Sequence, residues 1–521
     1  MTARSVTLRG ATYPLILPNL RDPRLHVAAV IITIHVLGQV ALGFRVSVPQ
    51  ILAAILTCAV LEIAITFRQS RAFVWPASAM LTGSGVALIL RAVGTPPGDP
   101  WTFYAWPIFA VVAGLSLLSK YVIKYKGTHV FNPSNIGLVV AFLVLGSSIV
   151  EPLDFWWAPL NGPMALAYAV IIVGGVLITR RLKLLSLAVA FWLGLAAGLG
   201  VLAASGHCMI TNWAFAPVCG VEYWRVIVTS PEVLIFLFFM ITDPRTVPAG
   251  PTGRIVFGLA VAVASVLLMA PQTDEFGTKV GLLAGLVIVC AARPLLDRFL
   301  PERESPRDDI RNLPWASPSA GDRARRIGVG ALAAVVLAVA VVAAGTPARG
   351  SVVPGGLEAL NRPAPVVDPS TLPPITIDQE VIDFDHERAG EGMNEVVIGL
   401  SQDLSLETRA VLEGDGELLT AIDHGDRLTE MQARVEDARS SGTATVEHYT
   451  FDEIHVSLLV PFGVQTGLSL GLTGRGTLVV EHYDADGNRT DSETRPFHQT
   501  FAMRQATGER WMLVGVLPPE S

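Results

Sequence analysis

The sequence predicts a polytopic α-helical membrane protein that ends in a soluble α+β domain. Composition is the first observation: of 521 residues, 51% are hydrophobic and only 16% are charged, far from the balance of soluble proteins. Apolar runs recur up to about residue 345, with the roughly 17–25 residues that a helix needs to cross a bilayer. Beyond them the sequence turns acidic. These observations separate a membrane half from a tail.

About eleven membrane spans are expected, ten within 26–297 and one more at the end of the membrane half. The apolar runs lie near 26–44, 47–67, 72–90, 101–119, 134–152, 162–179, 184–204, 225–242, 255–271, 279–297 and 327–344. Basic residues gather in alternate loops, for example at Arg68 and Arg71. Because Lys and Arg favour the cytoplasmic side, the N-terminal segment 1–25 and the basic loop 298–326 are predicted to be cytoplasmic. An Arg-rich, Lys-poor composition fits a bacterial plasma membrane.

The tail is predicted to be extracytoplasmic, since an odd number of spans separates it from the N-terminus. Residues 347–521 hold 29 acidic and 12 basic residues, a balance that argues against nucleic acid as a ligand. Residues 345–399 are expected to be a Pro-rich linker, and 400–521 a folded domain. An extracytoplasmic protein partner for this domain is one hypothesis.

The domain at 400–521 is expected to begin with helices and end with long strands. Helical patterning from Ser405 to Ser441 is broken at Gly414, Gly416 and Gly425. The β-rich runs are 443–449, 454–461, 467–482, 495–505 and 510–517, with a turn at Asp486-Gly487. This order resembles the nuclear-transport-factor-two-like cone fold, which hosts both enzymes and interaction modules and so assigns no function by itself.

Two of the four cysteines share one loop on the predicted extracytoplasmic side. Cys208 and Cys219 both lie between the seventh and eighth spans, where an oxidising environment favours a disulfide. A metal site formed by these cysteines with His207 is the alternative, although the spacing matches no common zinc motif. No metal ligand is therefore assigned.

The first of two polar motifs opens the fifth span. In Phe131-Asn132-Pro133-Ser134-Asn135, Asn132 suits the N-cap and Pro133 the first helical position. Free N–H groups at such a helix start attract an anion or a polar ring edge, and Asn135 adds an amide on the same side. The plainer interpretation is that Asn132 is only a cap.

The second motif, Thr242-Asp243-Pro244-Arg245, closes the eighth span on the same predicted side. Pro244 ends the helix, which leaves Asp243 at a C-terminus whose dipole disfavours negative charge. The carboxylate therefore needs a partner. Arg245 or Arg254 is the structural candidate, and N–H groups of a bound ring are the other.

Sequence around both motifs resembles one family of redox-pump proteins. The segments are 119–127 leading into 131–134, then 238–248 and 253–258. They are similar to the flavin-carrying membrane subunits of the Rnf electron-transport complex and of the sodium-translocating NADH:quinone reductase, and also to membrane proteins associated with enediyne biosynthesis. The resemblance covers about 26–297. It implies two five-helix halves of inverted topology, followed here by one extra span.

The resemblance also implies a flavin, either riboflavin or FMN, held noncovalently near the cytoplasmic face. The matching positions are Asn132, Asn135, Thr242, Asp243 and Arg245. In the pump subunits, FMN is esterified to a threonine in an extracytoplasmic loop. The corresponding loop, 147–157, contains no threonine, so no covalent flavin is expected. This loss weakens the electron-transfer hypothesis, because electrons cross a membrane only between closely spaced centres.

Three ionisable residues lie within predicted spans: His35, Glu62 and Glu232. They are candidates for an intramembrane ion path, with satisfied interhelical hydrogen bonds as the alternative. The segment Thr82-Gly83-Ser84-Gly85 is expected to allow close helix packing, or to admit a flat ring.

Two functional hypotheses follow. In the first, the chain is a flavin-binding electron-transport subunit of an oxidoreductase complex, with possible ion transport, rather than a complete enzyme. It has no nucleotide-binding glycine loop and no iron–sulfur cysteine set, so it needs other redox subunits or a soluble electron donor. In the second, it is a transporter or channel-like protein on the same scaffold without redox chemistry. No catalytic residue is assigned.

Overall fold

The computed structural model describes residues 3–8, 11–96, 98–152, 162–211, 213–297, 320–348, 366–459, 468–505 and 510–519. The chain forms two compact units. The membrane unit comprises Met1–His207, Cys219–Gln272 and Phe276–Thr346, and the tail unit comprises Cys208–Val218, Thr273–Glu275 and Pro347–Ser521. Two short segments from loops between apolar helices therefore belong to the tail unit.

Seven helical runs in the described chain are long and apolar enough to cross a bilayer. They are α1 (Pro23–Val40), α2 (Val48–Ser70), α6 (Gly162–Arg181), α7 (Leu185–Ala204), Gly220–Met240, α10 (Pro251–Met269) and Ala331–Ala348, which starts within α13 (Ala320–Ala344). Apolar side chains such as Leu56 and Leu193 point outward, with more than half of their surface exposed. Helices with such faces suit hydrocarbon, because their backbone polar groups are bonded internally. These runs place the chain among membrane proteins.

The helices α3 (Ala77–Ile89) and α5 (Pro133–Leu145) are shorter than the spans predicted at 72–90 and 134–152. Each has 13 residues and so rises only about 20 Å. Beyond them, β4 (Leu90–Ala92) pairs with β7 (Val150–Pro152), and a buried ion pair joins Arg91 to Glu151 at 2.9 Å. Apolar composition continues into this strand pair, which is why the predicted spans extend past the helix ends. The count of eleven full spans stays a prediction.

The span predicted over 225–242 is present as the helical run Gly220–Met240, but this run is not one uninterrupted α-helix. The structure instead has α8 (Gly220–Thr229), α9 (Pro231–Ile235) and a π-helix, η1 (Phe236–Met240). The break falls at Ser230, whose side chain caps α9 by accepting the Val233 N–H at 3.1 Å. Pro231 follows without an N–H to continue the preceding helix.

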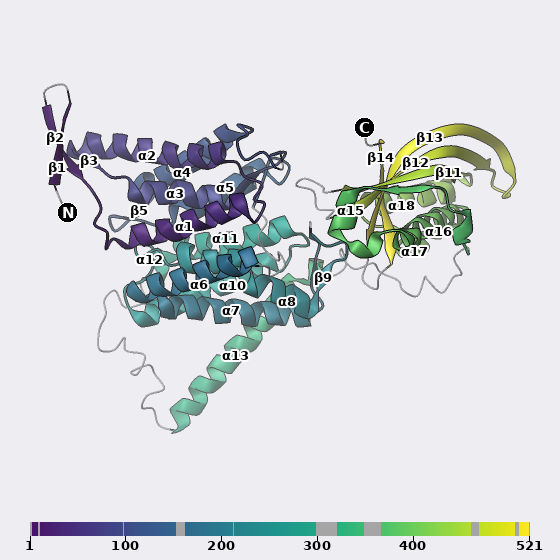
Figure 1. Cartoon of the computed structure of the whole chain (residues 1–521). Helices are drawn as coiled ribbons and strands as arrows, with labels where there is room; N and C mark the ends of the chain where they lie inside the picture. The colour runs from purple at the N-terminus through teal and green to yellow at the C-terminus, as the bar shows by residue number, and fades with distance from the viewer. Residues whose placement is uncertain are drawn as a thin grey trace. The chain divides into compact units, whose positions relative to one another are not determined.

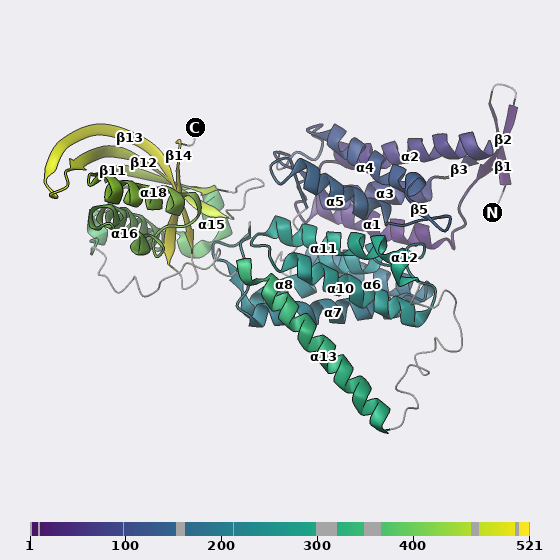
Figure 2. The ribbon, with the colours of Figure 1, turned by 180° about the vertical axis from the view of Figure 1, so that it is seen from behind.

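Helices α1–α5, with α4 (Trp106–Val122), form one group and α6–α11, with α11 (Glu275–Ala291), form another (Figures 1 and 2). In the first group α2 packs against α3 and α4, and in the second α7 packs against α10. Glycines permit these contacts: a Cβ on Gly83 would lie 2.5 Å from the Ala54 carbonyl oxygen, and one on Gly258 would lie 2.6 Å from that of Leu187. Gly83 thus serves the close packing expected of its motif.

The N-terminal segment forms a small sheet at one end of α2. Strands β1 (Ala3–Leu8) and β2 (Ala11–Ile16) make an antiparallel hairpin, and β2 pairs in parallel with β3 (Phe73–Val74). The Tyr13 ring packs against Phe67, with centroids 5.1 Å apart. Sequence patterning did not predict this sheet, since its strands are short.

The tail unit contains a five-stranded sheet in the order β10-β11-β12-β13-β14. Its strands are β10 (Ile375–Ile377), β11 (Ala444–Leu459), β12 (Ser469–Tyr483), β13 (Arg489–Gln505) and β14 (Trp511–Leu517). The two strands predicted at 443–449 and 454–461 are the single strand β11, with a bulge between Phe451 and Glu453. The predicted turn lies between β12 and β13, where Gly487 has a φ of +77°.

Helices pack against this sheet. They are α15 (Gln379–Phe384), α16 (Glu391–Glu413), α17 (Gly416–Leu419) and α18 (Gly425–Ser441). The helix breaks predicted at the glycines are present, and Gly414 ends α16 with a φ of +66°. Ordered elements begin well before residue 400, so the linker predicted over 345–399 is shorter than expected. Residues 349–365 of that linker, and 298–319 of the predicted basic loop, lie outside the described residues.

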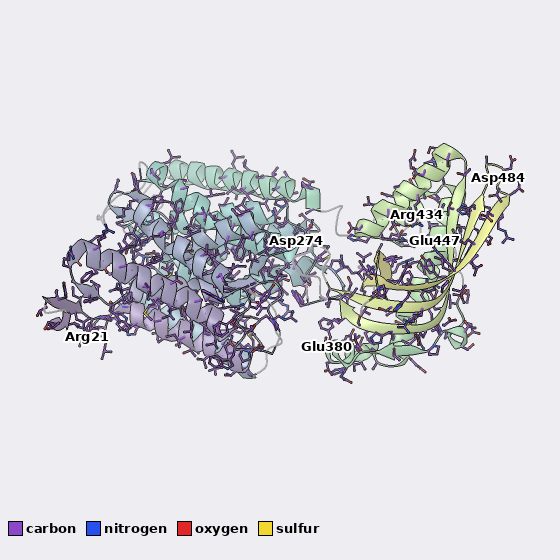
Figure 3. The ribbon with its side chains drawn as sticks, turned by 90° about the horizontal axis from the view of Figure 1, so that it is seen from above. Arg21, Asp274, Glu380, Arg434, Glu447 and Asp484 are labelled. Atoms are coloured by element: carbon purple, nitrogen blue, oxygen red, sulfur yellow. The ribbon has the colours of Figure 1, made fainter. Side chains whose placement is uncertain are left out.

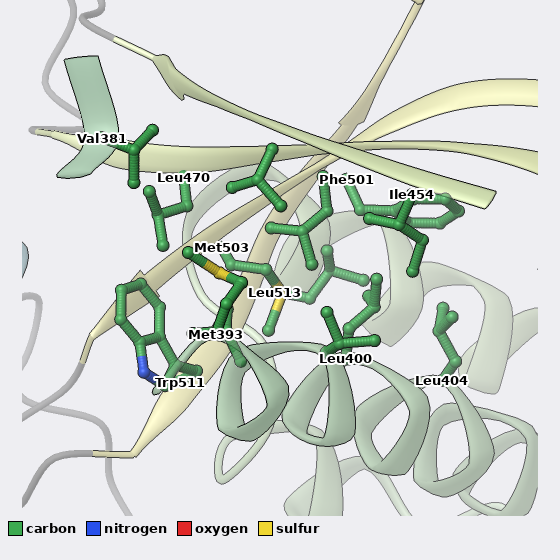
Figure 4. Packing of buried hydrophobic residues seen from close by; sticks show 14 of the residues in the cluster. Val381, Met393, Leu400, Leu404, Ile454, Leu470, Phe501, Met503, Trp511 and Leu513 are labelled. Carbon is green, nitrogen blue, oxygen red and sulfur yellow. The ribbon is translucent and has the colours of Figure 1, made fainter. Parts of the chain in front are cut away.

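The core of the tail unit lies between α16 and the sheet (Figure 4). Met393 and Leu400 of α16 meet Phe501 and Leu513 of the strands, and all four side chains are fully buried. Phe215 joins the same core from the loop between α7 and α8.

Phe215 holds its loop in the tail unit. Its ring centroid lies 5.4 Å from that of Trp511 and 5.0 Å from that of Phe384, and the side chain is 6% exposed. The Thr211 carbonyl in the same loop accepts the Leu468 N–H at 3.1 Å. The loop is therefore a structural part of this unit.

A buried ion pair joins two helices of the tail unit. Glu407 on α16 accepts two hydrogen bonds of 2.6 Å from Arg427 on α18, and both side chains are almost fully buried. At the unit's surface, Arg434 of α18 lies 3.2 Å from Glu447 of β11 (Figure 3). Burial raises the pKa of Asp423 well above its usual value, and the nearby carboxylate of Glu407 raises it further.

Candidate ligand cavity

A cavity of about 410 Å³ lies in the membrane unit, a volume within the range of small-molecule sites. Its walls come from the starts of α1 and α5, from α3, from the end of α6, and from η1 with the loop that follows. Polar lining residues include Arg24, Thr82, His129, Asn132, Thr242, Asp243 and Arg245. The structure therefore brings both polar motifs together at one cavity.

Asn132 joins the two motifs through its side chain. Its Oδ1 accepts the Asn135 N–H at 3.2 Å and the Ser134 hydroxyl at 2.8 Å, and its Nδ2 donates to the Met240 carbonyl at 3.1 Å. The capping role predicted for Asn132 is present. Because both ends of the amide are occupied, Asn132 shapes the cavity wall more than it offers polar groups to a ligand.

The π-helix η1 places the second motif against the cavity. Its wider turn pairs the Ile241 N–H with the Phe236 carbonyl at 3.1 Å, and the Thr242 hydroxyl donates to the Phe238 carbonyl. A Cβ on Gly175 of α6 would lie 2.3 Å from the Phe238 ring, so that glycine makes room for it. Short π segments recur at functional sites.

Asp243 has a partner that sequence reasoning missed. Its Oδ2 lies 2.9 Å from Nε2 of His129, and its Oδ1 accepts the backbone N–H of Arg245 at 3.0 Å. Of the two arginines expected as partners, Arg245 contacts Asp243 through its backbone N–H, whereas Arg254 donates to the backbone carbonyls of Pro248 and Lys183. His129 belongs to β6 (Thr128–His129) and is 7% exposed. The sequence signal that could have indicated His129 was its position three residues before Asn132.

Asn135, the fifth position implied by the resemblance, is not among the residues that line this cavity. Its Nδ2 donates to the Leu283 carbonyl of α11 at 3.0 Å, and the side chain is 1% exposed. One turn into α5, the side chain points into the helix packing. It therefore fixes α5 against α11.

Positive charge lies at the cavity from two directions. Arg24 at the start of α1 donates from Nε to both carboxylate oxygens of Asp22, at 3.0 and 3.1 Å, and this hydrogen bonding lowers the pKa of Asp22. Arg245 is exposed, and its guanidinium makes no hydrogen bond or ion pair within the described ranges. It is the more available cation for an anionic group on a ligand.

Among the three candidate ion-path residues, Glu62 is linked through an ion pair to a residue that lines the cavity. Its carboxylate pairs with Lys120 Nζ at 3.0 Å and accepts the Tyr121 hydroxyl. Lys120 Nζ also lies 3.5 Å from the hydroxyl of Ser78, which lines the cavity. A buried ion pair therefore stands directly behind one cavity wall.

His35 and Glu232 also have partners. Nε2 of His35 lies 3.1 Å from the Ser84 hydroxyl, and Glu232 lies 3.5 Å from Nζ of Lys279. His35 thus makes an interhelical hydrogen bond, and Glu232 makes an interhelical ion pair.

Cys208 and Cys219 are disulfide-bonded, while Cys58 and Cys290 are free. The bridge closes the loop that carries Phe215, next to the paired strands β8 (Cys208–Met209) and β9 (Val218–Cys219). The two thiols that were the alternative metal ligands are joined in this disulfide. Of the threonine-free loop 147–157, residues 153–157 lie outside the described residues.

Fold and cavity together define a class: a polytopic membrane protein with a ligand-sized cavity between polar helix ends and a separate α+β unit. No protein-family model matches the chain. A search of curated proteins also finds no match.

Proposed function

We propose that this chain is a membrane-embedded subunit of an electron-transfer system and binds a flavin noncovalently in the cavity between its two polar motifs. The observation that supports this is the convergence of Asn132, Thr242, Asp243 and Arg245 on one cavity. They are four of the five positions that the resemblance to flavin-carrying pump subunits implies. The cavity volume also suits a fused heterocyclic ring.

The surroundings offer complementary chemistry for such a ligand. Phe238, Phe239 and Leu81 supply an apolar wall for a flat ring, and Gly85 leaves space beside α3. The His129–Asp243 pair supplies polar groups for a ring edge. Arg245 suits a ligand phosphate, which would favour FMN over riboflavin.

The proposed arrangement in the membrane follows from charge and packing. Basic residues flank the cavity end of the helices, which supports a cytoplasmic position for that end under the positive-inside rule. The matching contacts of α2 with α4 and of α7 with α10 support two related five-helix halves. The proposed topology leaves the tail outside the cytoplasm, where the disulfide is chemically stable.

Flavin release tests the proposal. Purified protein is denatured with acid, and the supernatant is analysed for flavin absorbance and fluorescence. We expect riboflavin or FMN near one equivalent per chain, with none left on the polypeptide in a denaturing gel. Colourless protein that also fails to take up added flavin contradicts the proposal and favours a transporter-like function on the same scaffold.

Matched substitutions locate the flavin. Asp243→Asn removes the charge at the cavity and is expected to lower flavin occupancy at least severalfold, because a charged hydrogen-bond partner contributes about 1.5–3 kcal/mol. Asp297→Asn is the control: Asp297 pairs with Lys126 at 3.6 Å but does not line the cavity. Equal occupancy in both variants would place the flavin elsewhere.

A further inference from the structure

The geometry of the His129–Asp243 pair suits a second role besides supplying polar groups for a ring edge. The Nε2–Oδ2 distance is 2.9 Å, and both residues line the cavity. The second ring nitrogen of His129, Nδ1, makes no hydrogen bond within the described chain. The carboxylate thus holds the imidazole at Nε2 and leaves Nδ1 to exchange a proton with the cavity.

The pair is held from both sides. Asp243 is fixed by the Arg245 N–H at 3.0 Å, and His129 stands opposite Lys124 in the two-stranded sheet β5-β6, where β5 is Lys124–Tyr125. Asp243 is therefore a positioning residue for the imidazole. Other charged or titratable groups around the pair are Asp22, Arg24, Lys124, Arg245, Cys290 and Arg293.

We propose that His129 takes up a proton when the flavin in this cavity is reduced and releases it on reoxidation. This inference rests on the proposed function, and it adds that electron transfer at the site is coupled to proton exchange. A flavin bound here would supply two-electron chemistry, in which reduction by a soluble reductant would add one proton and one net negative charge to the ring near neutral pH. His129 binds a second proton at Nδ1 and keeps its Nε2–H donated to Asp243.

The balance is two protons for two electrons, so the cavity gains no net charge. Asp243 favours this proton uptake, because a carboxylate stabilises the imidazolium that forms beside it. The proton enters at the end of the helices where His129 lies. No side chain within a span is required, which fits the paired state of His35, Glu62 and Glu232.

The test is a redox titration of the flavin-loaded full chain, with dithionite as reductant, at several values of pH between 6 and 8. Two protons per two electrons give a midpoint potential that falls by about 59 mV per pH unit, and one proton gives about 30 mV. We expect the larger slope for the unmodified protein. His129→Gln, which keeps a donor toward Asp243, is loaded with flavin at a saturating concentration and is expected to show the smaller slope.

His26→Gln is the matched control. His26 lies in α1 with Nδ1 3.3 Å from the Arg181 guanidinium and does not line the cavity, so the larger slope is expected to remain. A slope near 30 mV in the unmodified protein overturns the inference even if His129→Gln does not fold. An unchanged slope in His129→Gln also overturns it. Absence of bound flavin instead counts against the proposed function, which separates the two failures.

Discussion

Two polar pairs, one from each unit of this protein, show two different uses of charge. In the tail unit, Glu407 and Arg427 face each other directly and satisfy one another through two hydrogen bonds. In the membrane unit, His129 and Asp243 are paired at one atom each and still line an open cavity. A pair whose polar atoms bond only to each other stabilises packing. A pair that lines a cavity keeps polar atoms available to a ligand. The surroundings of an ion pair therefore indicate function better than its burial does.

The largest expected effect falls on the closed pair. Glu407→Gln leaves the buried Arg427 guanidinium without its main counter-charge and is expected to destabilise the tail unit by about 3–5 kcal/mol. Hydrogen exchange of α16 and α18 in the full chain measures this. Replacing both residues by methionine is the control, because an apolar pair of similar volume is often tolerated. Flavin occupancy is expected to stay unchanged in the Glu407→Gln variant. A loss of flavin would contradict the separation of the tail-unit pair from the cavity.

Phe215 extends the comparison of the units from charged pairs to apolar packing. Phe215→Ala empties a place beside Trp511 and Phe384 and is expected to cost about 3 kcal/mol, as for other buried aromatic residues. We expect faster amide hydrogen exchange in β14 and faster proteolysis within the loop between α7 and α8. Leu193→Ala, at a lipid-exposed position of α7, is the control. Equal protection of β14 in the Phe215 variant and the control would show that the loop is not part of this core.

Sequence patterning predicted much of the fold because both units follow simple periodicities. Apolar runs located the helices, and the glycines at 414, 416 and 425 marked the breaks in the tail. It missed η1, because a π-helix leaves the same hydrophobic pattern as an α-helix. It also missed Phe215, since a lone aromatic in a loop says nothing about which core receives it.

At the cavity, sequence reasoning pointed to the two helix ends that line it but did not predict which side chains meet there. Asn132 and Asp243 were recognised from capping and dipole arguments, which are local. The His129 contact spans 114 positions along the chain, and the Asn135 contact to Leu283 spans 148. Such pairings depend on the packing of distant helices, so periodicity and local propensity do not predict them.

A change of pH is expected to have a smaller effect on the stability of the tail unit. Burial raises the pKa of Asp423 above its ordinary value of 3.8, so the folded state holds a proton that the unfolded chain has released. Stability is therefore expected to fall as pH rises above that value. Asp423→Asn is expected to remove part of this fall and to stabilise the unit at alkaline pH. Thermal unfolding between pH 5 and 9 measures it; a stability lower than that of the unmodified protein throughout would contradict the assignment.

The smallest effect is expected at the cavity's exposed cation. Arg245→Gln removes a guanidinium that has water on one side, so its attraction for a ligand phosphate is screened and worth about 0.5–1 kcal/mol. FMN binding is expected to weaken by about threefold at low salt, while riboflavin binding stays the same, because riboflavin has no phosphate. Fluorescence quenching titrations with both flavins measure this difference. Arg254→Gln is the control, since that guanidinium is occupied by the carbonyls of Pro248 and Lys183. If Arg245→Gln weakens both flavins equally, then Arg245 contacts the ring or shapes the loop, and the cavity holds its ligand in a different orientation from the one proposed.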